Sequence, residues 1–206
     1  MPPAGGLWRG AAPLQLASRS LARQDLLRGA GLPFELINAS IDERALEQEA
    51  RDAGAGPAEV ARRLAGAKAL AAAAPRGALV IGADQTLELD GTAFHKPADR
   101  TAARAQLQAL AGRSHVLHAA VAVVRDGALL FETLAAARLT MRALDDAALD
   151  AYLDAAGAAV LGSVGAYQLE GLGIHLFTRI EGEHSVILGL PLLPLLAFLR
   201  REGLLL

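Results

Sequence analysis

The stretch Ala78-Leu79-Val80-Ile81-Gly82-Ala83-Asp84-Gln85 lies near the middle of the chain and decides its fold class. Its first four residues form a continuous apolar run, which is typical of a strand buried on both faces. Because α/β proteins bind ligands beyond the carboxyl ends of such strands, Asp84 is a candidate functional residue. A carboxylate there can hold a metal ion or take a proton from water, and a turn-forming aspartate is the alternative.

The segments around this strand predict a mixed α/β fold. A helix is expected immediately before it, at residues 58–74, and Asp90-Gly91 and Asp126-Gly127 predict hairpin turns. Further strands are expected at 14–17, 34–38, 116–124, 128–141 and 174–180, and further helices at 21–28, 99–110, 145–155 and 192–202. No linker divides the chain, so we expect one α/β domain over residues 1–206 with a mixed sheet.

Composition excludes several classes of protein. The chain has 206 residues, of which 53% are hydrophobic, and it contains no cysteine, so it has neither disulfides nor a thiolate metal site. A net charge of −2 provides no overall field for DNA or RNA. Any phosphate binding must therefore come from a local cluster of basic residues.

Two terminal segments bear on localisation. Residues 1–10 lack the charged region and apolar run of a secretory signal. Residues 186–199 are apolar, but they contain Pro191 and Pro194 and are shorter than the roughly 20 residues that span a bilayer. We therefore expect a cytoplasmic protein without a membrane anchor.

A candidate anion site lies at the first strand-to-helix turn, in Ser18-x-Ser20-x-x-Arg23. Free N–H groups at a helix N-terminus, two hydroxyls and a guanidinium together suit a phosphate group. The alternative is a serine helix cap followed by a solvated arginine.

Two further groups of charged residues are candidates. Lys68 and Lys96 are the only lysines among 20 basic residues, which indicates positions where a compact ammonium is preferred to a planar guanidinium. Asp42-Glu43 follows a predicted strand and could supply oxygen ligands to magnesium, and a plain acidic loop is the alternative. The five histidines show no metal-binding spacing, so we expect them in packing or surface roles.

Taken in order, these motifs resemble those of the Maf family of nucleoside triphosphate pyrophosphatases. The resemblance covers the chain from Leu14 to about Gly203. The similar segments are Leu16–Arg23, Leu26-Leu27, Gly31–Phe34, Asp42-Glu43, Ala67–Ala69, Gly82–Gln85, Lys96-Pro97, Ala111–His115, Gly165–Gly173 and Gly189–Pro191. The resemblance implies an elongated mixed sheet with a cleft between two lobes. It also implies hydrolysis of a nucleoside triphosphate to the monophosphate and pyrophosphate, and by analogy a possible homodimer.

The resemblance also implies roles for particular residues. Glu43 and Asp84 would hold a divalent cation, Mg or Mn, and Asp84 would also activate water. Lys68, Lys96 and Arg23, assisted by Ser18 and Ser20, would bind the phosphates and stabilise the leaving pyrophosphate.

Three positions depart from the pattern of pyrimidine-preferring relatives. Ala22 stands where many members have arginine, Gln85 where they have threonine, and Glu170 where they have glutamine. This combination is similar to that of the family branch that acts on 7-methyl-GTP. The chemistry is consistent with that resemblance, since an ionised glutamate can accept from the N1–H and N2–H groups of guanine. The alternatives are a dTTP/UTP-preferring enzyme, a hydrolase of non-canonical purine triphosphates, and a nucleotide-binding regulator of cell division.

Overall fold

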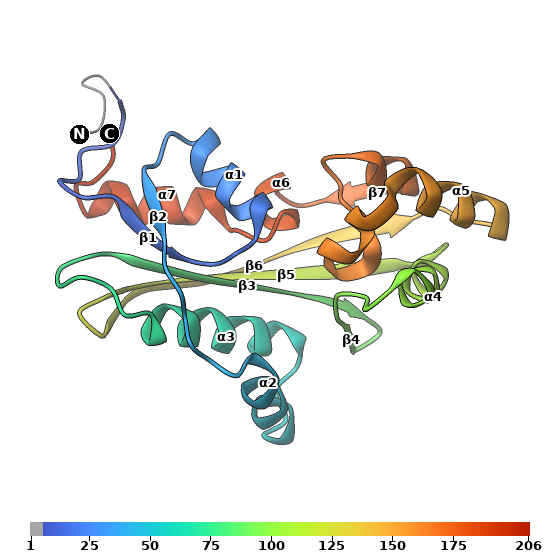
Figure 1. Ribbon diagram of the computed structural model, residues 1–206, viewed down its shortest axis with the longest axis horizontal. Coiled ribbons are helices and arrows are strands. Elements are labelled where there is room, and N and C mark those ends of the chain that lie inside the picture. The colour runs from blue at the N-terminus through green and yellow to red at the C-terminus, as the bar shows by residue number, and fades with distance from the viewer. Residues whose placement is uncertain (1–5) are drawn as a thin grey trace.

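A single mixed sheet of seven strands forms the centre of the protein (Figure 1). The computed structural model describes residues 6–206. The strand order is β2-β1-β3-β5-β6-β7, with β4 added beside β3; β1 pairs in parallel with β2 and β3, and all other pairs are antiparallel. The strands are β1 Leu14–Ala17, β2 Phe34–Leu36, β3 Val80–Leu89, β4 Thr92–Phe94, β5 Ser114–Arg125, β6 Ala128–Met141 and β7 Phe177–Glu181. The predicted mixed α/β fold is confirmed.

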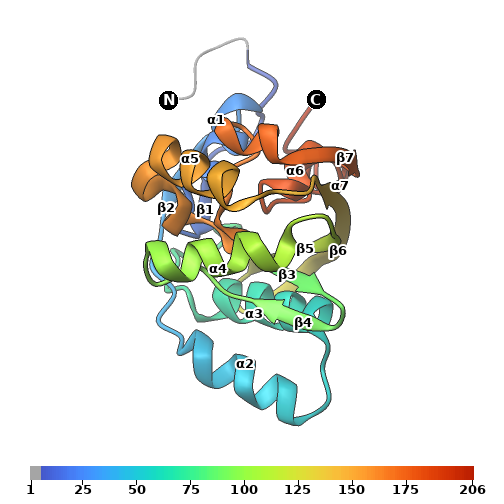
Figure 2. The same cartoon turned by 90° about the vertical axis from the view of Figure 1, so that its right-hand side faces the viewer.

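Helices cover both faces of the sheet (Figure 2). They are α1 Leu21–Gly29, α2 Glu43–Asp52, α3 Pro57–Ala71, α4 Arg100–Leu110, α5 Asp146–Ala156, α6 His184–Ile187 and α7 Leu192–Arg201. Short 3₁₀ turns occupy Gly157–Gly162, Val164–Ala166 and Leu172–Leu176. Helices α2 and α3 lie below the sheet in Figure 1, and α1, α6 and α7 lie above it. None of the helices in residues 6–206 is long and apolar enough to cross a bilayer.

Helix α3 packs unusually close to β3 because of one glycine. A Cβ atom on Gly82 would lie 2.2 Å from the carbonyl oxygen of Ala65 and 2.5 Å from the backbone nitrogen of Ala69, so only glycine fits there. The alanines of α3 pack at the same contact. This close approach holds Lys68, which lies between Ala65 and Ala69 on α3, beside the strand that carries Asp84.

The opposite face of the sheet carries two separate apolar cores, which form the two lobes expected from the sequence. One core packs Ile81 and Val121 against α1 and α7. The other packs Leu87 and Leu117 against α4 and α5. Between these halves of β3 lie the polar residues Asp84-Gln85-Thr86, and the boundary between the cores coincides with them.

The middle of β3 also lies at a break in its strand pairing. Strand β1 ends beside Gly82, and β4 pairs with β3 only from Leu87 onward. Asp84 therefore lies within a long strand and not after its end, which corrects the sequence-based prediction. The carboxyl end that borders the site is that of β1, and β3 continues because antiparallel β5 pairs with it from Val80 to Glu88.

Three other predictions need correction. Residues after Asp42 form helix α2, which was missed because few of its residues are apolar. Strand β2 ends at Leu36, before the predicted residue 38. The predicted strand at 174–180 begins only at Phe177, since backbone bonds from Gly171 and Gly173 to the carbonyl oxygen of Gln168 fold the preceding segment into a turn.

The remaining predictions agree with the structure to within a few residues. The turns at Asp90-Gly91 and Asp126-Gly127 join antiparallel strands, and the Asp and Gly residues of both have positive φ. The helices predicted at 58–74, 99–110, 145–155 and 192–202 are all present. The expectation of no secretory signal in residues 1–10 concerns in part residues 1–5, which lie outside the described residues.

Candidate active site

A cleft of about 980 Å³ opens at the break in strand pairing beside β3. It brings together the ten residues to which the family resemblance gives a catalytic, binding or specificity position: Ser18, Ser20, Ala22, Arg23, Glu43, Lys68, Asp84, Gln85, Lys96 and Glu170. Their spatial convergence is established by the structure. Asp42, the other candidate metal ligand, does not line the cleft; it is the N-cap of α2, and its carboxylate accepts from the backbone N–H of Ala45.

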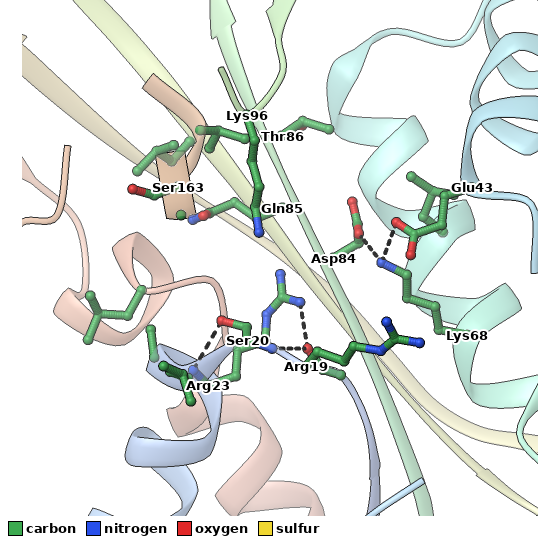
Figure 3. Close-up of a pocket in the computed structure, with 18 of the residues that line it drawn as sticks. Arg19, Ser20, Arg23, Glu43, Lys68, Asp84, Gln85, Thr86, Lys96 and Ser163 are labelled. Atoms are coloured by element: carbon green, nitrogen blue, oxygen red, sulfur yellow. Dashed lines mark hydrogen bonds and ion pairs between the residues drawn. The ribbon is translucent and has the colours of Figure 1, made fainter. Parts of the chain in front are cut away.

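Lys68 and Asp84 form a buried ion pair on the floor of the cleft (Figure 3). The Lys68 ammonium donates to Asp84 Oδ1 at 2.6 Å, and Glu43 Oε2 lies 2.8 Å from the same nitrogen. Burial raises the pKa of the Asp84 carboxyl, while Lys68 and Arg23 act in the opposite direction. One ammonium thus bridges the two carboxylates that the sequence assigned to a metal ion.

Arg23 is buried and largely engaged with the backbone. Its Nε donates to the carbonyl oxygen of Gly189 at 2.8 Å, and its Nη1 donates to that of Ala83 at 2.9 Å and to Ser18 Oγ at 3.0 Å. Burial lowers the pKa of the guanidinium, with Asp84 opposing that shift. Within residues 6–206, the Nη2 group makes no hydrogen bond, so its N–H groups are available to a ligand.

The β1–α1 turn has the structure that its serines predict. Ser20 is the N-cap of α1, and its hydroxyl accepts from the backbone N–H of Arg23. Ser18 Oγ accepts from Arg23 and from the backbone N–H of Ser20. The open N-terminus of α1 therefore faces the cleft with positive electrostatic potential.

Lys96 extends into the cleft from the loop after β4 and points toward Arg23 (Figure 3). It is exposed, and it has no hydrogen bond or ion pair within residues 6–206. Partial desolvation lowers its pKa, and Arg23 and Lys68 lower it further. Three cations thus face one region that holds two carboxylates, and the surplus of positive charge favours a polyanionic ligand.

Gln85 is committed to the protein itself. Its side-chain amide donates to the carbonyl oxygens of Val186 and Ile187, both at 3.0 Å. These bonds fasten α6 to the sheet and so position Leu188, which lines the cleft. Only the side-chain oxygen of Gln85 remains free to contact a substrate.

The segment that precedes Glu170 rests on a neutral buried pair. His115 Nε2 lies 2.7 Å from the Tyr167 hydroxyl, inside the apolar core below α4. Burial lowers the pKa of His115 to about 4 and raises that of Tyr167. The predicted packing role of this histidine is confirmed, and the pair holds the segment that carries Glu170.

Several cleft residues were not identified from the sequence. Arg19 and Arg44 line the cleft beside candidate residues, and their neighbours in the sequence were the only available signal. His95 lies 3.6 Å from Glu47 of α2, and its carbonyl oxygen accepts from Gln106, which holds the Lys96 loop. Spacing could not reveal these contacts, because they join segments whose relative placement depends on α2.

Five carboxylates line the cleft, those of Asp25, Glu43, Glu47, Asp84 and Glu170. Within residues 6–206, no cluster of three histidine or acidic side chains is arranged to hold a metal ion. Glu43 and Asp84 supply two carboxylates that converge on the Lys68 ammonium. This donor set suits Mg²⁺, which is commonly bound by one or two carboxylates together with substrate phosphates and water.

Comparison with known proteins agrees with the geometry. The chain is 60% identical over 97% of its length to a nucleoside triphosphate pyrophosphatase of Nitrobacter winogradskyi, 98% of which is covered. It is 58% identical over 97% of its length to one of Bradyrhizobium diazoefficiens, with 98% covered. It is 50% identical over 92% of its length to a 7-methyl-GTP pyrophosphatase of Brucella abortus, with 96% covered. The family model described as Maf-like protein matches residues 13–202, and the chain therefore belongs to the Maf family.

Proposed function

We propose that this protein hydrolyses a nucleoside triphosphate to the monophosphate and pyrophosphate. The observation that carries the proposal is the cluster of three cations facing Asp84 beside the open N-terminus of α1. The names of relatives that are 60% and 58% identical to the chain support it. These features suit an extended polyphosphate better than a single anion.

In the proposed reaction, a water oxygen attacks the α-phosphorus. The new bond forms between that oxygen and the α-phosphorus, the bond to the oxygen that bridges the α and β phosphorus atoms breaks, and pyrophosphate leaves with the bridging oxygen. Asp84 orients the water and accepts its proton. Burial raises the pKa of this carboxyl, which favours acceptance of a proton.

The cations stabilise charge that develops on the leaving group. Lys96 and the free Nη2 of Arg23 are available for phosphate oxygens without breaking a contact within residues 6–206. Lys68 can exchange its carboxylate partners for the substrate. The hydroxyls of Ser18 and Ser20 and the α1 N-terminus complete this surface, and such preorganised electrostatics is the main source of catalysis in phosphoryl transfer.

Glu43 and Asp84 are the residues that would hold a divalent cation, Mg or Mn. The cation would neutralise phosphate charge when bound. For it to bind, Lys68 would release at least one carboxylate, and the incoming phosphates would offer the ammonium new partners.

The base is proposed to be guanine-like. Glu170 lines the cleft, and a carboxylate accepts from the N–H groups of guanine. The Brucella relative named 7-methyl-GTP pyrophosphatase supports this preference. Gln85 contributes through its free oxygen and through the placement of Leu188, since its amide donates to the backbone.

The test is pyrophosphate release from a panel of triphosphates that includes GTP, 7-methyl-GTP, ITP, UTP and dTTP, with magnesium or manganese. We expect release to require the metal, to stop with a chelator, and to be fastest with a guanine base. A preference for UTP or dTTP would retain the reaction and reject the role of Glu170. A preference for ITP would favour the non-canonical purine enzyme, and tight binding without release would favour the regulator.

A further inference from the structure

The two ends of the candidate active-site cleft carry opposite charges. At one end, Glu170 borders a smaller apolar pocket between α1 and α7, above the sheet in Figure 1, and its carboxylate has no ion pair in the described part of the chain. At the other end, Arg44 lies in the first turn of α2, below the sheet, and Arg19 lies in the β1–α1 turn. Figure 3 shows Asp84 of β3 between Ser163 on one side and Arg19 on the other.

The Arg19 guanidinium is exposed and keeps most of its donors free. Its Nη2 donates to Asn38 Oδ1 at 3.0 Å, which is the only hydrogen bond or ion pair that this side chain makes among residues 6–206. Gln24 donates to the carbonyl oxygen of Arg19 at 3.4 Å, beside the N-cap Ser20. Because a guanidinium has five N–H donors, Arg19 can bind an anion and still keep its bond to Asn38.

Arg44 is exposed, and the carboxylates that are near it in the sequence are bound to other residues. Glu43 Oε2 lies 2.8 Å from the Lys68 ammonium. Glu47, three residues beyond Arg44 on α2, lies 2.6 Å from Arg51. Arg44 itself has no hydrogen bond or ion pair within residues 6–206. The two arginines therefore leave uncompensated positive charge at this end of the cleft.

This distribution of charge orients an extended anion. The N–H groups of a base suit Glu170, and phosphates suit the cations. A nucleotide with its base beside Glu170 and its α-phosphate beside Asp84 extends its remaining phosphates toward Arg19 and Arg44. The three cations around Asp84 serve a triphosphate in the proposed reaction, so the two further guanidiniums are available to the end of the phosphate chain.

We propose that Arg19 and Arg44 form a distal subsite for the end of the phosphate chain, and that the protein therefore also hydrolyses nucleoside 5′-tetraphosphates. The inference rests on the proposed function and adds a substrate class that is defined by the length of the phosphate chain. Both arginines are exposed, so a fourth phosphate can extend toward solvent at this end.

The bonds that form and break are the same as for a triphosphate. A water oxygen bonds to the α-phosphorus and gives its proton to Asp84. The bond between the α-phosphorus and the oxygen that bridges it to the β-phosphorus breaks, and tripolyphosphate leaves with that oxygen. Tripolyphosphate carries more negative charge than pyrophosphate, and the distal arginines meet this additional charge with charge-assisted hydrogen bonds.

The experiment compares guanosine 5′-di-, tri- and linear tetraphosphate by formation of GMP in the presence of magnesium. We expect kcat/KM to increase with the number of phosphates, and the tetraphosphate to be hydrolysed at least as well as GTP. Calorimetric binding of the α,β-methylene analogues of GDP and GTP measures the contribution of the third phosphate without turnover, because carbon replaces the oxygen at the bond that would be cleaved.

Variants with methionine in place of arginine locate the effect. Arg19→Met and Arg44→Met should each lower kcat/KM for the tri- and tetraphosphate, and the affinity for α,β-methylene-GTP, about tenfold. The affinity for α,β-methylene-GDP should change less than about twofold. Arg138→Met, at an exposed position of β6 that does not line the cleft, is the matched control and should change none of these values. Arg44→Met tests the subsite independently of the bond between Arg19 and Asn38.

A tetraphosphate that resists hydrolysis while GTP is hydrolysed would overturn the inference and keep the proposed function. Equal losses of affinity for the two methylene analogues in the arginine variants, or no loss for either analogue, would also overturn it, because a distal subsite must respond to chain length. Absence of GMP from every nucleotide would reject the proposed function, and binding of the two analogues would still decide whether the subsite exists.

Discussion

Two buried polar pairs each have one member on a central strand, Asp84 on β3 and His115 on the neighbouring β5, and the pairs differ in almost every respect. Lys68–Asp84 is charged, borders the cleft, and has Glu43, Arg23 and Lys96 around it. His115–Tyr167 is neutral, lies in an apolar core, and has no charged partner among residues 6–206. The first pair can exchange its partners for a ligand, whereas the second is satisfied by the fold alone. A buried polar pair can therefore take part in a reaction only where further charged groups surround it and the site is open to solvent.

The largest expected effect comes from neutralising the charged pair. Asp84→Asn should lower kcat about 10²- to 10⁴-fold, because the amide cannot accept the proton of water. Folding should be retained, since the amide oxygen can still accept from Lys68 and Glu43 remains nearby. Pyrophosphate release and thermal unfolding measure the two properties. Asp126→Asn, in an exposed hairpin, is the matched control, and near-normal kcat in Asp84→Asn would reject Asp84 as the base.

The neutral pair should reveal itself through the pH dependence of stability. The pKa of His115 is about 4 in the fold, compared with 6.5 for a free histidine. The unfolded chain therefore binds the proton first as pH falls from 6.5, and the free energy of unfolding decreases by about 3 kcal/mol at pH 4. Denaturant unfolding of the protein and of His115→Gln, compared between pH 7 and pH 4, isolates this contribution. Identical pH dependence in the two proteins would contradict it.

A smaller effect should separate function from stability within the cleft. Lys96→Met should lower kcat/KM about 30-fold, because one charge-assisted contact to phosphate is lost. The free energy of unfolding should change by less than about 0.5 kcal/mol, since Lys96 is exposed and lacks a partner within residues 6–206. Kinetics and thermal unfolding test this, with the exposed Arg201→Met as control. A large loss of stability would show that Lys96 supports the fold.

Local sequence patterns predicted the helices, turns and caps that depend only on residues close together in the chain. The alanine-rich α3, the hairpin at Asp126-Gly127 and the serine cap at Ser20 follow from propensity and turn chemistry over a few residues. Helix α2 was missed because it contains few apolar residues and buries only Ala50. The order of the motifs along the chain identified the ten candidate residues, and the fold places all ten around one cleft.

The chain order of residues established the mixed α/β class, the family resemblance and the identity of the candidate residues. Tertiary structure alone decided that Asp84 lies inside β3, where β1 ends and β4 has not begun. It also decided that Gln85 donates to α6 and that an apolar pocket meets the cleft at Glu170. The physical reason is that strand pairing and side-chain hydrogen bonds join residues that are far apart in the chain, 166 positions for Arg23 and Gly189, and no local pattern records which residues meet.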